Sequence, residues 1–200
     1  MKTSLRWPRV SFAVAVMSLA AIALPTAWAT QLELTRAPLD GRACWQLWSG
    51  HLLHFGLIHA LTDLLTLLVA ASVVETALGT RRTTLLYCVT PPVLSLLTLL
   101  TAPQLAAYRG ASALAVMMGF AAGGVLWRDT RLRVPVALIV ALFLVKLAGD
   151  AAGAATDLSG LPTGIELAWQ AHAVGALIGS TLALHLARGK AAARYGMIST

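Results

Sequence analysis

Charged side chains are scarce in this 200-residue chain. Asp, Glu, Lys and Arg make up 12% of it, whereas soluble domains carry about 25%. Hydrophobic residues make up 58%. So few charges cannot solvate the surface of a soluble domain, and the composition therefore indicates an integral membrane protein. The formal net charge of +7 comes from small basic clusters between apolar runs, without the aromatic-interleaved basic patch of a nucleic-acid-binding protein. We expect the lipid bilayer, and no nucleic acid, as the partner of this charge.

Cysteines and internal repeats are also lacking. The two cysteines, Cys44 and Cys88, lie in separate segments that we place on opposite sides of the membrane, so we expect no disulfide. There is no CxxC pair of the kind that binds metals. The absence of a repeat argues against a secondary transporter, because many of those are built from repeated halves.

Long apolar runs dominate what remains. A helix needs about 20 mostly apolar residues to span a bilayer. The candidate spans are residues 10–29, 57–78, 83–102, 112–127, 133–149 and 167–187. We therefore predict an all-α, polytopic membrane protein with a bundle of six transmembrane helices. The segment 1–29 also resembles a signal peptide, with a basic start and the end Ala27-Trp28-Ala29, but its long apolar run favours a retained first helix.

The basic residues predict the orientation. Eleven of the fifteen Lys and Arg residues fall at the N-terminus, in the second and fourth connections, and in the tail 188–200. Because Lys and Arg favour the cytoplasmic side, both termini are predicted to be cytoplasmic. The connection 150–166 has no Lys or Arg, so it is an outer loop, and it is long enough to move as a lid.

One serine lies where a helix is expected to start. Ser112 follows Gly110, whose backbone can adopt a positive φ, and it opens the span 112–127 at its outer end. A helix start favours developing negative charge, because its free N–H groups and dipole point there. Ser112 shares a helical face with Gly119 and Gly123, and we expect that face to make a close helix contact.

Three further polar residues are predicted near the same level of the membrane. His172 shares a face with Gly175 and Gly179 in the span 167–187. His59 and Asp63 are four residues apart and so share a face of the span 57–78. Polar residues inside a membrane are costly and therefore indicate function. A nucleophilic serine needs a base, which His172 can supply, and oxyanion donors, to which His59 can contribute.

Each of these features has a simpler reading. A serine at a helix start is most often an N-cap, and paired glycines alone indicate packing. Lys146 and Asp150 are spaced as an ion pair near the outer end of their span. A small proton or ion transporter using Asp63, Lys146 and the histidines is one alternative. A metal site is another, with these candidate ligands: His51, His54, His59 and Asp63.

Taken together, the motifs resemble the rhomboid intramembrane serine proteases. The matching elements are Trp45, the HFxxxH run from His54 to His59, Asp63 in place of the usual Asn, Glu75 ahead of Gly79, Gly110-Ala111-Ser112-Ala113, and the AHxxGxxxG run from Ala171 to Gly179. Their order and spacing cover about residues 45–187. The compact size and the Tyr108-Arg109-Gly110 sequence look most like the bacterial rhombosortase branch, which is linked to proteins with a C-terminal Gly-Gly-type membrane tail.

The resemblance implies a single rhomboid-like domain over residues 1–200, in the bacterial inner membrane, with its active site toward the periplasm. It implies a serine endopeptidase that cleaves transmembrane segments of membrane-anchored proteins. Ser112 would be the nucleophile and His172 the base of a dyad. His59, the position of Asp63 and the Ser112 N–H would form the oxyanion hole, supported by Gly110. No metal and no organic cofactor is implied.

Three positions depart from the family pattern. Ala113 replaces the last glycine of the serine motif, which restricts the turn. Asp63 replaces an amide, and an ionised carboxylate accepts hydrogen bonds but cannot donate one to an oxyanion. Val116 stands one turn after the serine, where many rhomboids have a residue that packs on the histidine. An inactive rhomboid-like protein that binds transmembrane segments without cutting them is therefore a second alternative.

Overall fold

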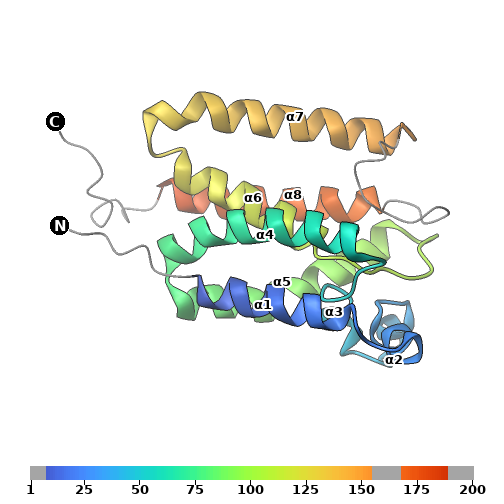
Figure 1. Ribbon diagram of the computed structural model, residues 1–200. Helices are drawn as coiled ribbons and strands as arrows, with labels where there is room; N and C mark the ends of the chain where they lie inside the picture. The colour runs from blue at the N-terminus through green and yellow to red at the C-terminus, as the bar shows by residue number, and fades with distance from the viewer. Residues whose placement is uncertain (1–7, 155–167, 189–200) are drawn as a thin grey trace.

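The protein is a helical bundle, shown here by a computed structural model that describes residues 8–154 and 168–188. Its helices are α1 (Arg9–Ala21), α2 (Thr26–Leu32), η1 (Ala37–Asp40), α3 (Gln46–Ser49), α4 (Leu57–Leu78), α5 (Thr80–Thr101), α6 (Ser112–Leu126), η2 (Thr130–Leu132), α7 (Arg133–Ala151) and α8 (Trp169–Arg188). The long helices run side by side, α2 lies at one end of the bundle, and α7 runs along its outside (Figure 1). Over the described residues, the predicted all-α class is confirmed.

Within residues 8–154 and 168–188, three helical stretches are long and apolar enough to cross a membrane. They are α4, α5 and the continuous stretch of η2 and α7, Thr130–Ala151. The helices α1 and α6 are apolar but shorter. These stretches support the prediction of a membrane protein. The span predicted over 57–78 coincides with α4, while α5 starts three residues earlier than predicted, at Thr80.

The first predicted span, residues 10–29, is wrong as a single helix. The helix α1 ends at Ala21, and α2 starts again at Thr26. Pro25 lies in the break and is extended, with ψ 143°. Proline has no N–H to donate and disfavours helical backbone in the residue before it, so the apolar run cannot continue as one helix.

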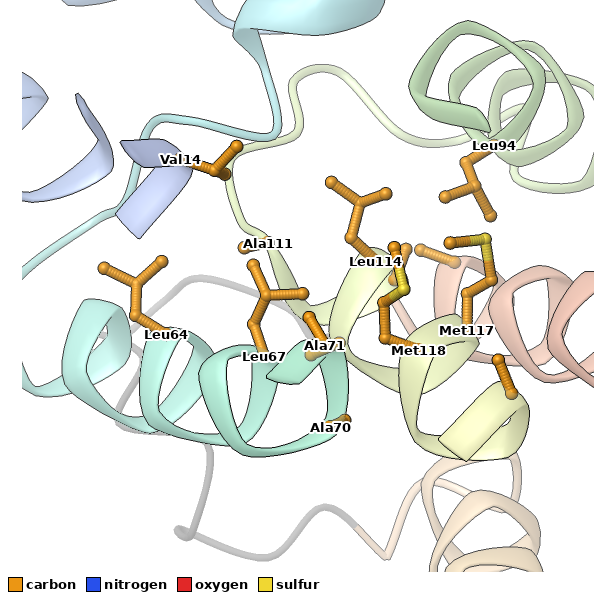
Figure 2. Packing of buried hydrophobic residues seen from close by; sticks show 14 of the residues in the cluster. Val14, Leu64, Leu67, Ala70, Ala71, Leu94, Ala111, Leu114, Met117 and Met118 are labelled. Carbon is orange, nitrogen blue, oxygen red and sulfur yellow. The ribbon is translucent and has the colours of Figure 1, made fainter. Parts of the chain in front are cut away.

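The apolar core lies where α1, α4, α5 and α6 meet. Figure 2 shows Leu67 and Ala71 of α4 facing the Leu114 and Met118 side chains of α6. Leu67 and Met118 are fully buried. Small residues on α4 and α6 let these two helices approach closely, and the larger side chains fill the space that remains.

The helices α6 and α8 are in backbone contact. A Cβ atom on Gly175 would lie 2.5 Å from the carbonyl oxygen of Ala113, and one on Gly179 would lie 2.6 Å from that of Met117. No real Cβ tolerates such distances, so these two positions of α8 require glycine. The predicted close-contact face of α8 is therefore confirmed.

The matching prediction for α6 is wrong. A Cβ on Gly119 would meet nothing within 4 Å, and one on Gly123 would touch only the side chain of Val136 in α7, at 3.4 Å. The close glycine of α6 is Gly124, which packs against the backbone of Ala183 in α8. The reason is the rotation of α6 about its axis. The helical face that contains Ala113 contacts α8, and the face that contains Ser112 does not.

Two prolines inside α5 explain how α3 docks against it. Pro91 and Pro92 have no N–H, so the carbonyls four residues earlier lose their helical partners. One of these, the carbonyl of Cys88, accepts a hydrogen bond of 2.8 Å from the indole N–H of Trp48. A side chain thus replaces the missing backbone donor and fixes the α3 region against α5.

Candidate active site

Ser112 is the first residue of α6, as predicted. Ala111 occupies the N-cap position and makes no side-chain hydrogen bond there, so it does not cap the N–H groups of the first turn. Within the described part of the chain, the Ser112 hydroxyl has one hydrogen-bond partner, the Tyr108 hydroxyl at 3.4 Å, and makes none with His172. The serine therefore lies at a helix N-terminus that its N-cap residue leaves without a side-chain cap.

Gly110 is required by its surroundings. Its φ is +150°, a region that L-residues rarely adopt. A Cβ here would also lie 3.2 Å from Asp63 Oδ2 and 3.3 Å from His59 Nε2. The N–H of Gly110 donates to the carbonyl of Gly50 at 3.1 Å. The turn before Ser112 thus rests directly on the polar side chains of α4.

The segment 33–34 holds this turn from the other side. Leu34 and Tyr108 form an antiparallel bridge, with N–O distances of 2.8 and 3.1 Å. The guanidinium of Arg109 pairs with the Glu33 carboxylate at 2.8 Å and lies 5.3 Å from the centre of the Phe55 ring. Both ends of the Arg109–Glu33 ion pair are mostly buried, so the pair anchors the turn rather than facing solvent.

The carboxylate of Asp63 meets two histidines. Its Oδ2 lies 3.3 Å from Nε2 of His59 and 3.4 Å from Nε2 of His54, and all three side chains are buried. The predicted shared face of His59 and Asp63 is confirmed. The N–H of Ala111 donates to His54 Nε2 at 3.3 Å, which ties this cluster to the residue before the serine.

The hydrogen bonds around His59 indicate where its proton lies. Its Nδ1 accepts from the N–H of Phe55 at 3.5 Å, so in the neutral ring the proton is on Nε2. His59 Nε2 lies 3.3 Å from Asp63 Oδ2, but that oxygen has no hydrogen-bond partner among the described residues, so this N–H is not committed to Asp63. An ionised Asp63 offers only acceptor atoms to the site, which is the opposite of the donor role of an amide.

His172 lies in the first turn of α8 and is buried. One turn later Gly175 touches the carbonyl of Ala113, the residue after Ser112. The starts of α6 and α8 are thus held together by backbone contact beside both side chains. Ala113 is fully buried in this contact, while Val116 is only half-buried.

The remaining candidates are placed elsewhere. His51 is buried against α5. Its Nε2 forms hydrogen bonds with the Pro91 carbonyl at 3.2 Å and with Ser95 Oγ at 3.0 Å. Burial lowers the pKa of His51 from 6.5 to about 4. The four predicted metal ligands are therefore not gathered into one set. Lys146 and Asp150 form the predicted ion pair, at 2.5 Å.

The loop 150–166, predicted to move as a lid, falls mostly outside the described residues. Cys44 and Cys88 are both exposed and free. The sequence did not single out the hydroxyl of Tyr108 or the pairing of Arg109 with Glu33. The spacing of Tyr108, four residues before Ser112, could have indicated that their hydroxyls meet. The Arg109–Glu33 pair joins residues 76 apart, which no local pattern reveals.

Comparison with known families agrees with this arrangement. The Rhomboid domain matches residues 41–189, which is most of the chain and includes each of Ser112, His172, His59, Asp63 and Gly110. No curated protein matched the chain. Members of this family are intramembrane serine proteases. The chain belongs to the rhomboid family.

Proposed function

We propose that this chain is an intramembrane serine endopeptidase with Ser112 as nucleophile and His172 as general base. The observation that carries the proposal is the contact of Gly175 with Ala113, because it brings the first turns of α6 and α8 together. Each of these turns bears one of the two side chains. A hydroxyl and an imidazole on adjoining helix starts are the parts that acyl transfer needs.

In the proposed mechanism, the Ser112 hydroxyl gives its proton to His172 as Oγ forms a bond to the scissile carbonyl carbon. The electron pair of the C=O bond moves onto the oxygen. As this intermediate collapses, the C–N bond breaks and His172 returns the proton to the leaving amine. Water then hydrolyses the acyl-enzyme by the same steps, with His172 again as base. The reaction needs no metal or organic cofactor.

The oxyanion is stabilised by the start of α6 and by His59. The N–H of Ser112 points out of the first helical turn, and the helix dipole favours negative charge there. His59 supplies the N–H on Nε2, which makes no hydrogen bond with Asp63. Gly110 leaves the space between these groups and the turn free of a side chain.

The topology and partners of this proposal follow the charge pattern. The protein lies in a bacterial inner membrane, both termini are cytoplasmic, and the site opens toward the periplasm. The substrates are transmembrane segments of membrane-anchored proteins, unwound near the outer surface. The Tyr108-Arg109-Gly110 sequence favours the rhombosortase branch and substrates with a Gly-Gly-type tail. The chain forms one domain over residues 1–200, with its core at about 45–187.

A second candidate is an inactive relative that binds transmembrane segments. Two observations favour it. Asp63 places a carboxylate 3.2 Å from the position that a Gly110 Cβ would take, close to where negative charge must develop. Ala113 fills the position where a glycine would relax the turn, and it is fully buried.

Labelling with a fluorophosphonate probe tests the proposal. Detergent-solubilised wild type should be labelled, and Ser112→Ala and His172→Ala should each lose labelling and substrate cleavage while keeping the wild-type melting temperature. Ser72→Ala is the matched control, because the Ser72 hydroxyl bonds only within its own helix, to the Leu68 carbonyl. If wild type and the double variant Asp63→Asn/Ala113→Gly both stay unlabelled, the inactive alternative replaces this proposal.

A further inference from the structure

The candidate site is short of hydrogen-bond donors for an oxyanion. Asp63 can only accept, and its Oδ2 already faces His54 and His59. The N–H of Ala111 is occupied by His54. The remaining donors, the Ser112 N–H and the His59 ring, must stabilise a negative charge beside a carboxylate. Donors aimed at developing charge are among the largest contributions to catalysis, so a further one would be valuable here.

A further donor lies within reach of the nucleophile. The hydroxyl of Tyr108 is 3.4 Å from Ser112 Oγ, and the tyrosine is buried with 6% of its surface exposed. In the tetrahedral intermediate, the oxyanion is bonded to the carbon that Oγ attacks. A hydroxyl this close to Oγ can therefore turn its O–H toward that oxygen with a rotation of its own proton.

The Tyr108 side chain is held by parts of the fold other than α6. Its backbone is paired with Leu34 in both directions. Its ring packs edge-on against His51, with 5.7 Å between ring centres. His51 is itself fixed to α5 through Pro91 and Ser95. The hydroxyl is thus preorganised, which is the property that makes a donor effective in a transition state.

Its surroundings also keep this hydroxyl protonated. Burial raises the pKa of Tyr108, and the nearby Asp63 raises it further, against hydrogen bonds from Ser112 and the Ala113 amide. The titratable groups that face it are His51 from the loop before α4 and Asp63 from α4. A tyrosine that stays neutral keeps its own proton, so its O–H remains able to donate.

We propose that Tyr108 is a catalytic residue whose hydroxyl donates to the oxyanion and replaces the donor that position 63 does not provide. This inference rests on the proposed function. In the resting state the hydroxyl bonds to Ser112 Oγ. When Oγ bonds to the carbonyl carbon and the serine proton moves to His172, the Tyr108 O–H turns to the new oxyanion and keeps its proton throughout.

The test compares Tyr108→Phe with Tyr87→Phe in full-length protein cleaving a model transmembrane substrate in liposomes. Tyr87 is the matched control, because its hydroxyl is also buried but lies near Ser11 and Glu75. We expect Tyr108→Phe to lower kcat about 100-fold with KM nearly unchanged, and Tyr87→Phe to leave both near wild type. Cleavage by Tyr108→Phe at the wild-type rate overturns the inference.

A double-mutant cycle separates a donor from a structural role. Asp63→Asn restores an amide donor, so Tyr108→Phe should cost at most about 10-fold in that background. An equal loss in both backgrounds contradicts the shared role. Difluorotyrosine at position 108 keeps the shape but lowers the hydroxyl's pKa, so the alkaline fall of kcat should begin at lower pH than in wild type. If the fall of kcat begins at the same pH as in wild type, the donor role of Tyr108 is also contradicted.

Failure of the proposed function and failure of the Tyr108 role give different results. If wild type shows no cleavage that depends on Ser112, the proposed function is wrong. If wild type cleaves in a Ser112-dependent manner and Tyr108→Phe matches it, only the role of Tyr108 is wrong.

Discussion

The helices α4 and α7 have almost the same mean hydropathy and yet opposite environments. In the apolar window of α4, 44% of the residues are buried inside the protein, against 6% in α7. Six large side chains of α7 are at least half exposed: Val134, Leu138, Ile139, Leu142, Leu144 and Val145. Hydropathy thus identifies a helix that suits a membrane but does not tell a core helix from one that faces lipid.

The difference lies in small residues and polar side chains. The α4 helix carries alanine at three of its buried positions, 60, 70 and 71, and offers His59 and Asp63 to the site. The α7 helix touches α6 near Gly123 through Val136 and carries the Lys146–Asp150 pair. The closely packed part of the protein is therefore the group α4, α6 and α8, which positions the candidate site. The α7 helix is the part that can be changed with least effect on the fold.

The largest effect should come from breaking the α6–α8 contact. Gly175→Val places side-chain atoms where even a Cβ would lie 2.5 Å from the Ala113 carbonyl, so the two helices must separate. We expect a loss of more than about 3 kcal/mol of folding free energy and no detectable fluorophosphonate labelling. Unfolding in mixed detergent–SDS micelles measures the first, and gel fluorescence the second.

Gly149→Val is the control for this change. It introduces the same side chain on α7, at a glycine whose Cβ would meet nothing within 4 Å. Its stability should stay within about 1 kcal/mol of wild type, the value of helix propensity alone. Similar losses in both variants would mean that α6 and α8 are not the closely packed pair described here.

The sequence predicts much of the α4–α6–α8 group and little of how its helices are rotated. The existence and ends of α4 and α6 follow from hydropathy and from Gly110 before Ser112. The contact face of α8 follows from Gly175 and Gly179. The contact face of α6 cannot be predicted in this way, because Gly119 and Gly123 form as regular a stripe as Ala113 and its neighbours. Rotation is decided by partners that are distant in the sequence.

The site itself was predictable in its parts. His59 and Asp63 are on one helix, so their spacing alone places them together. The second histidine on Asp63, His54, lies in the irregular loop before α4, where no periodicity predicts direction. The docking of Tyr108 depends on its bridge to Leu34, a pairing across 74 residues that only the folded chain reveals. Tertiary contacts, not local propensity, complete the site.

A buried leucine and a lipid-facing one give a smaller contrast. Leu114 of α6 is 2% exposed, whereas Leu142 of α7 is 70% exposed. In a membrane the transfer term is small, since lipid is as apolar as the core, but the lost packing remains. We expect Leu114→Ala to cost about 2 kcal/mol and Leu142→Ala close to zero, measured by SDS unfolding. Equal effects would place α7 in the core.

The smallest predicted effect concerns α1, whose first turn is held by one carboxylate. Glu75 of α4 accepts hydrogen bonds from the Val10 N–H at 3.2 Å, the Ser11 N–H at 3.2 Å and the Ser11 hydroxyl at 2.9 Å. A negative charge at a helix N-terminus is also favoured by the dipole. Glu75→Gln removes the charge and one acceptor, and should cost about 1–2 kcal/mol in SDS unfolding.

Thr76→Ala is the control for Glu75→Gln, because that exposed hydroxyl bonds only within α4, to the Ser72 carbonyl. If both variants unfold like wild type, α1 is held by its apolar contacts alone, and its attachment to the core would then resemble that of α7.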